Sequence, residues 1–273
     1  MAFRVDETGY GRIRTRRIRF GIMLFPGQVR RRANQRPPYD PPVTRAQLVS
    51  VHTRMTFQAA SIWQPFVIEE GDDTIEYSFV IDIGMSEDTT PVRAGSLDSG
   101  SWAEDGSDPE HTRTHRSARG EAMRHRFDNI AVVHPHFHGF GTEACAPALD
   151  VHGGIVQPTD STRHPGLQTR ASDVIWIGLN GMSPDDPNVS QTAAHEMGHL
   201  LGLASRPHDG GIMGSRRVTR EEYVHRFLSD RDKDLVHLAV ETRVPGSSIA
   251  MHVLQLPTPP ATSRRSVRVR RGH

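Results

Sequence analysis

The segment at residues 192–214 constrains the fold and chemistry of this 273-residue chain more than any other part. It reads TAAHEMGHLLGLASRPHDGGIMG and contains the pattern H-E-x-x-H at His195, Glu196 and His199. The residues between and around these three are small or apolar, which predicts a central, buried helix over 188–203. Because residues four apart lie on one face of a helix, both imidazoles can reach the same ion.

The residue types in this pattern indicate a catalytic zinc site. Imidazole nitrogen is a favoured zinc ligand, so we expect one catalytic Zn²⁺ bound by His195 and His199. Zinc lowers the pKa of a bound water to about 7, and an adjacent carboxylate can take its proton. Glu196 is therefore the candidate general base. Gly202, three residues after His199, is suited to a left-handed turn at which the chain leaves the helix.

The same residues, followed by Met213 in a glycine-rich loop, resemble the metzincin clan of zinc metallopeptidases, with a matrixin-like layout. The resemblance is specific over residues 194–214 and rests on the order of elements for residues 15–185. It implies a zinc-dependent endopeptidase that acts on a protein or peptide substrate. It also implies that Met213 supports the metal from a turn beneath it, and that an edge strand near residues 153–157 binds extended substrate by strand addition.

The chain departs from the extended metzincin motif at the third ligand. That position is Ser205, and a neutral hydroxyl is a poor zinc ligand. His208 is the expected substitute, because an imidazole nitrogen suits zinc and the residue precedes Met213; Asp209 is the next alternative. A gluzincin-like site would instead take Glu221 or Glu222 from a downstream helix. In a last alternative, two histidines bind metal weakly and catalysis is lost.

Two other classes of function stay open. A metzincin-like domain that binds without catalysis is favoured by Ser205. A protease-type toxin or effector delivered to another cell would have the same catalytic residues and differ only in its route of delivery.

The histidines of residues 133–139 (VHPHFHG) raise the question of a second metal. On a strand, His134, His136 and His138 would share one face. A structural ion is possible there, but we expect exposed loop histidines, because Pro135 breaks a regular strand. We expect Cys145 to be a lone structural thiol.

Composition excludes several other classes of protein. The chain has 33 Lys+Arg, 32 Asp+Glu and a formal net charge of +1, which gives no reason to expect nucleic acid or an anionic membrane as partner. One cysteine excludes an intrachain disulfide framework. No signal peptide or run of 18 apolar residues is visible. We therefore expect a monomer that is cytoplasmic or exported by a non-classical route.

Hydrophobic periodicity predicts an α+β fold. We expect a mixed twisted sheet with a long backing helix and an active-site helix, then a small C-terminal subdomain with one long helix. The predicted helices are 44–63, 188–203 and 219–240, and the predicted strands are 17–25, 66–69, 76–83, 130–133, 153–157 and 173–178. The predicted organisation is a flexible arm at 1–14, a catalytic domain at 15–256 with a polar inserted loop at 86–129, and a disordered Arg-rich tail at 257–273.

Overall fold

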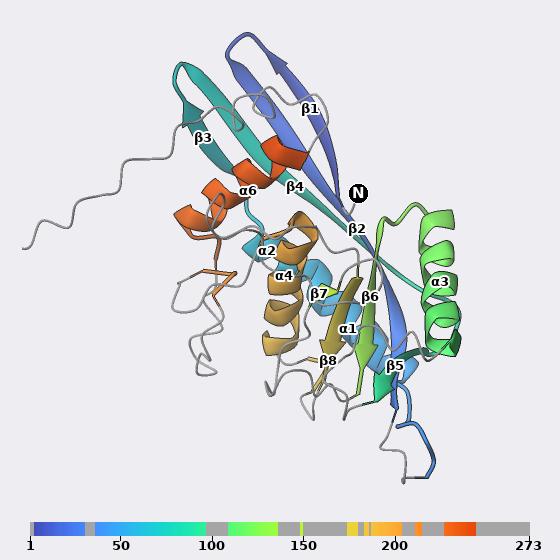
Figure 1. Ribbon diagram of the computed structural model, residues 1–273. Coiled ribbons are helices and arrows are strands. Elements are labelled where there is room, and N and C mark those ends of the chain that lie inside the picture. The colour runs from blue at the N-terminus through green and yellow to red at the C-terminus, as the bar shows by residue number, and fades with distance from the viewer. Residues whose placement is uncertain are drawn as a thin grey trace, which may run out of the picture.

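A long strand at the centre of a mixed sheet, β2 (Ile13–Arg30), organises the fold (Figure 1). The computed structural model describes residues 3–30, 36–96, 109–135, 148–149, 174–179, 183–185, 187–203, 211–214 and 227–243. The other strands are β1 (Arg4–Tyr10), β3 (Phe66–Glu70), β4 (Asp73–Met85), β5 (Val92–Ser96), β6 (Asn129–His134), β7 (Ala148–Leu149) and β8 (Val174–Gly178). The helices are α1 (Arg45–Arg54), the π-helix η1 (Met55–Ala59), α2 (Ala60–Ile62), α3 (Pro109–Arg124), α4 (Pro187–Leu201) and α6 (Asp230–Arg243).

The sheet has eight strands in the order β3-β4-β2-β6-β8-β7, and β1 and β5 also pair with β2. β4, β2, β6 and β8 are parallel, whereas β3 and β7 run antiparallel to their neighbours at the two ends of this order. The expected α+β architecture with a mixed sheet is confirmed. Four of the predicted strands are found with small changes in bounds, as β3, β4, β6 and β8, and the first is extended to all of β2.

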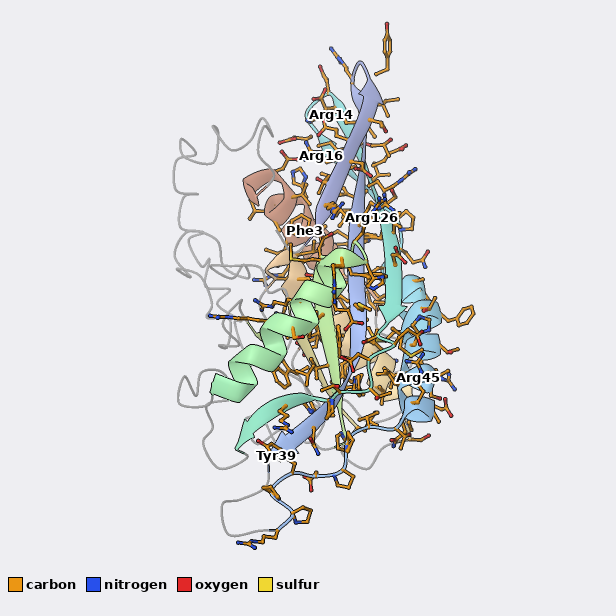
Figure 2. All side chains as sticks on the ribbon, turned by 90° about the vertical axis from the view of Figure 1, so that its right-hand side faces the viewer. Phe3, Arg14, Arg16, Tyr39, Arg45 and Arg126 are labelled. Atoms are coloured by element: carbon orange, nitrogen blue, oxygen red, sulfur yellow. The ribbon has the colours of Figure 1, made fainter. Side chains whose placement is uncertain are left out.

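Helices cover the two faces of this sheet. Successive side chains of a strand point to opposite faces, so β2 contributes to both cores. The larger core contains Ile18, Phe20, Ile22 and Leu24 of β2 with apolar residues of α1, η1, α2, α4 and α6. The smaller core contains Met23 and Phe25 together with Ala118 and Ala122 of α3. Figures 1 and 2 show α3 on one side of the sheet, and α1 and α4 on the other. On this face α1, η1 and α2 pack against β2 and β4, and α4 packs beside them against β8.

The backing helix forms as the sequence predicts. Thr44 is its N-cap: the Thr44 hydroxyl accepts from the backbone N–H of Gln47, and the Gln47 side chain accepts from the backbone N–H of Thr44. This capping box satisfies two backbone donors that the first helical turn leaves without partners. The helix then passes through the π-turn η1, which packs against α4, and ends at Trp63.

Two segments predicted to lack structure contain helices or strands in their described parts. The arm at residues 1–14 contains β1, which pairs with β2 through the turn at Gly11, where φ is +65°. Opposite charges lie in register across the pair, as in Asp6 opposite Arg17. Within the predicted loop at 86–129, β5 pairs with β2, and α3 covers the smaller core. The sequence did not predict α3, because the described part of its buried face consists of Ala118 and Ala122, which give a weak apolar pattern.

The C-terminal helix is shorter than the predicted helix at 219–240. The described residues Phe227–Ser229 are not helical, and α6 begins at Asp230. The Ser229 hydroxyl accepts from the backbone N–H of Asp232, and the Asp232 carboxyl group accepts from the backbone N–H of Ser229. This second capping box fixes the start of α6, so the prediction was wrong for residues 227–229, whereas residues 219–226 lie outside the described residues. No helix in the described ranges has the length and apolar character needed to span a membrane.

Polar contacts join α6 to the upper part of the sheet. Arg16 of β2 is 1% exposed and forms ion pairs with Glu241 of α6 and with Glu7 of β1. Tyr77 of β4 makes a 2.7 Å hydrogen bond with Nδ1 of His237 on α6. Figure 2 shows Arg14 and Arg16 near the top of the sheet, above α3. These contacts hold α6 in a fixed position relative to β2 and β4.

Candidate metal centre

The helix α4 carries the H-E-x-x-H residues through the middle of the protein. From Gln191 to Leu203 every residue is buried, so this part of the helix has no solvent face. Its apolar side chains pack into the larger core, and they include Ala193, Ala194, Met197, Leu200 and Leu201. A helix that is buried on all sides is held rigidly by its surroundings, which is the condition for a preorganised site.

The side chains of His195, Glu196 and His199 converge. One potential ligand atom from each lies within 4.8 Å of the others, and the three residues are 7%, 1% and 5% exposed. Oε2 of Glu196 lies 3.9 Å from Nε2 of His199. The two imidazole rings are 5.1 Å apart between centroids and nearly perpendicular, at 85°. Among the described residues, this is the one group of three or more possible metal ligands.

Both imidazoles are oriented by backbone carbonyl groups. Nδ1 of His195 lies 2.7 Å from the carbonyl oxygen of Ile212, and Nδ1 of His199 lies 2.6 Å from that of Leu203. A carbonyl oxygen only accepts, so each Nδ1 carries the proton, and the lone pair of a neutral ring is on Nε2. Carbonyl partners of this kind orient histidines that bind a metal through the other nitrogen. The donor set therefore fits a zinc ion bound through the two Nε2 atoms.

Burial keeps His199 in the form that a metal requires. Removal from water, and then the neighbouring His195, lower the pKa of His199 to about 3, and the hydrogen bond to Leu203 opposes this change. The ring is therefore neutral over the physiological pH range. A neutral imidazole is the state in which histidine ligates a metal.

The chain leaves α4 at the predicted glycine. Gly202 has φ +82°, in the left-handed region that residues with a Cβ rarely adopt. The backbone N–H of Gly202 donates to the carbonyl of His199, and that of Leu203 donates to the carbonyl of Gly198. This turn places the Leu203 carbonyl against Nδ1 of His199. Gly202 thus both ends the helix and helps to orient the second histidine.

Met213 packs directly against the middle of the H-E-x-x-H sequence. A Cβ added to Gly198 would overlap Sδ of Met213 and lie 3.0 Å from its Cε. Met213 and its neighbour Ile212 are fully buried, and the Ile212 carbonyl accepts from His195. The turn at Gly211–Gly214 therefore contacts the site at two points, once through a backbone carbonyl and once through a thioether.

Several predicted site residues lie outside the described residues. These are Ser205, His208, Asp209, Glu221 and Glu222, so the third ligand stays a prediction. The predicted edge strand at 153–157 and Cys145 lie outside them as well. The edge strand that the structure does describe next to α4 is β7, which pairs antiparallel with β8.

The first histidine of the VHPHFHG sequence is buried, whereas exposed loop histidines were expected. His134 ends β6, is fully buried, and stacks on Trp176 with a centroid distance of 4.8 Å. Its ring approaches Gly27 so closely that a Cβ there would overlap Nδ1. The expectation of an exposed loop histidine was therefore wrong for His134, which is a packing residue. His136 and His138 lie outside the described residues.

Sequence reasoning missed two residues that contact the site from other elements. The indole N–H of Trp63 donates to the carbonyl of Ala194, at 3.1 Å, and so ties the backing helix to the residue before His195. Asp232 of α6 accepts from the backbone N–H of Ile212, at 3.2 Å. No sequence pattern near His195 or Ile212 indicates either contact. The pattern Ser229-x-x-Asp232 would have indicated where α6 begins.

Comparisons with known proteins give limited information. No family model matches the sequence, and no curated protein matches it. Among solved structures, the chain is similar to a zinc-dependent peptidase from Methanocorpusculum labreanum, with 13% sequence identity and a TM-score of 0.41. That match covers 79% of this chain and all of the other. A likeness this distant does not establish a family, so the function has to be inferred from the site.

Proposed function

We propose that this protein is a zinc-dependent endopeptidase of the metzincin type. The observation that supports this most strongly is the convergence of His195, Glu196 and His199 on the buried part of α4. Each Nδ1 is hydrogen-bonded to a backbone carbonyl, so the lone pair of each neutral ring is on Nε2, the atom through which it would bind zinc. Gly202 in the left-handed region and Met213 beneath Gly198 are the other features that agree with a metzincin site.

In this proposal the chain's own groups carry out the proton transfers. A bound zinc ion would lower the pKa of a water molecule and polarise the scissile carbonyl. Glu196 accepts a proton from the attacking water and returns it to the leaving amine nitrogen when the peptide bond breaks. Its carboxylate lies beside both imidazoles at 1% exposure, so its orientation is set by packing. Met213 holds the floor of the site without binding the metal.

The remaining parts of the proposal concern the third ligand and the substrate. His208 is proposed as the third ligand, with Asp209 as the alternative and Glu221 or Glu222 as the gluzincin-like alternative. An extended peptide would add to the sheet along β7, the described edge strand beside α4. Backbone hydrogen bonds would then align the substrate with the helix that bears Glu196.

Glu196→Gln tests the function directly, because it removes the base and keeps the shape of the side chain. We expect the variant to bind zinc like the wild type and to hydrolyse peptides slower by a factor of about 10² or more. Glu121→Gln is the matched control: it makes the same chemical change on α3, on the opposite side of the sheet, and should retain activity. Equal cleavage by the wild type and Glu196→Gln at equal zinc occupancy would refute the mechanism.

A binding domain without catalysis is the second candidate, and Ser205 in the position of the third ligand is the observation that favours it. This candidate predicts weak zinc binding and no chelator-sensitive cleavage of peptides by the wild type. The endopeptidase predicts cleavage that stops when zinc is removed and returns when it is added back.

A further inference from the structure

Asp232 anchors the turn that contacts the metal centre. It lies in the first turn of α6, and its side chain is fully buried. Its Oδ2 atom accepts three hydrogen bonds: from the Ile212 backbone N–H at 3.2 Å, and from the Ser229 backbone N–H and hydroxyl, both at 2.9 Å. One carboxyl oxygen thus joins the start of α6 to the turn at Gly211–Gly214.

The turn is shaped to receive this carboxyl group. Gly211 has φ +103°, and a Cβ there would overlap Oδ2 of Asp232 and lie within 2.8 Å of Cβ of Ser229. A residue with a side chain would therefore be strained by its backbone and would displace the carboxyl group. The close approach of α6 to the turn depends on glycine at this position.

Ile212 is held on both sides of its α-carbon. Its N–H donates to Asp232, and its carbonyl oxygen accepts from Nδ1 of His195. The position of this carbonyl decides which nitrogen of His195 carries the proton and which way Nε2 points. A shift of the turn would therefore rotate the imidazole or change its tautomer, and a change of either kind reduces the affinity of a histidine for a metal.

We propose that Asp232 is a positioning residue for the metal centre, which acts through the Ile212 backbone to hold His195 in the Nδ1–H tautomer with Nε2 directed to the metal. This inference rests on the proposed zinc site for its effect on metal binding. Its effect on the His195 tautomer does not depend on zinc. α6 is in turn fixed to the sheet by Arg16 and Glu241, so the orientation of His195 depends on the packing of α6.

Three variants separate this role from ordinary stability. Asp232→Leu removes the acceptor and fills a similar volume, whereas Asp232→Asn keeps an acceptor for the Ile212 N–H. Ser229→Ala is the matched control, because it removes the cap hydroxyl of α6 and leaves the contact between Asp232 and Ile212 in place. Thermal unfolding is recorded for all three, and we expect Ser229→Ala to lower the unfolding temperature.

The first readout is the ¹⁵N NMR tautomer pattern of His195 in the metal-free protein. The wild type, Asp232→Asn and Ser229→Ala should show Nδ1–H, and Asp232→Leu should show an added Nε2–H population. The second readout is zinc affinity by chelator competition, which we expect to fall by about 10–100-fold in Asp232→Leu and to stay unchanged in Ser229→Ala.

Two results would overturn the inference: a wild-type tautomer in Asp232→Leu, or an equal loss of zinc affinity in Asp232→Leu and Ser229→Ala. If Asp232→Leu does not fold, the wild-type protein still tests the inference. A scalar coupling between the Ile212 amide nitrogen and the Asp232 carboxyl carbon must then be seen across their hydrogen bond, and its absence would overturn the inference. A wild type that binds no zinc would refute the proposed function, while the tautomer would still test the role of Asp232.

Discussion

Gly198 offers a sharp test of the packing beneath the metal centre, because two opposing effects meet at this residue. Alanine in place of glycine in a helix interior stabilises by about 1 kcal/mol when nothing obstructs the new methyl group. At Gly198 the methyl group would overlap Sδ of Met213 in a fully buried region. Overpacking of a core costs about 1–3 kcal/mol, and the flexible thioether places the value in the lower part of that range.

Gly198→Ala should therefore lower the free energy of unfolding by up to about 1 kcal/mol, the difference between these two effects. Met213→Ala removes the obstructing side chain and by itself costs about 2–5 kcal/mol. In that background Gly198→Ala should stabilise the protein, so the sign of its effect reverses. The double-mutant cycle then gives a coupling energy of at least about 1 kcal/mol, the size expected for residues in contact.

Urea unfolding followed by circular dichroism, with a chelator present, measures these free energies without a contribution from bound metal. Gly120→Ala in α3 is the control, because a Cβ there has no atom within 4 Å. It should stabilise the protein by about 1 kcal/mol in both backgrounds. If Gly198→Ala has the same effect with and without Met213, the contact between them contributes nothing, and the packing argument is refuted.

Two further predictions concern the third zinc ligand and His237 of α6. His208→Ala should weaken zinc binding far more than Ser205→Ala or Asp209→Ala, because a zinc site with an open position needs three protein ligands; equal affinities, measured by chelator competition, would refute His208. His237 is hydrogen-bonded to Tyr77, and its burial lowers its pKa. The charges of Arg16 and Arg14 lower this pKa further, whereas those of Glu70 and Asp234 raise it. Because the imidazole of His237 binds a proton more readily in the unfolded chain, the free energy of unfolding should fall as pH drops below 6.5, the ordinary pKa of histidine. His237→Gln should therefore lose less stability than the wild type between pH 8 and pH 5.

The parts of the fold that sequence predicted are those in which local pattern and tertiary packing agree. The strong periodicity of α4, the N-cap at Thr44 and the apolar strand β8 each specify an element without help from distant residues. Gly202 was predictable for the same reason, since the left-handed turn it permits is a local property of the chain. The convergence of His195, Glu196 and His199 likewise follows from spacing on one helix.

The parts that sequence missed depend on partners far along the chain. β1 is a strand because β2 lies beside it, and the described part of α3 buries alanines, Ala118 and Ala122. Asp232 reaches a turn 20 residues earlier in the sequence, and Trp63 reaches a helix 131 residues later. No local pattern reports contacts of this range. For the same reason, the ligand that completes the metal centre stays a prediction.

The most direct test of the central claim is to locate zinc in the crystal by anomalous diffraction at its absorption edge. We expect one strong peak about 2.0–2.1 Å from Nε2 of both His195 and His199, with an imidazole of His208 as the third ligand. Three results would contradict the account: zinc bound through the Nδ1 atoms of these histidines, zinc bound elsewhere in the chain, or no anomalous peak after crystals are soaked in zinc. Such a result would leave the H-E-x-x-H helix as a structural element alone.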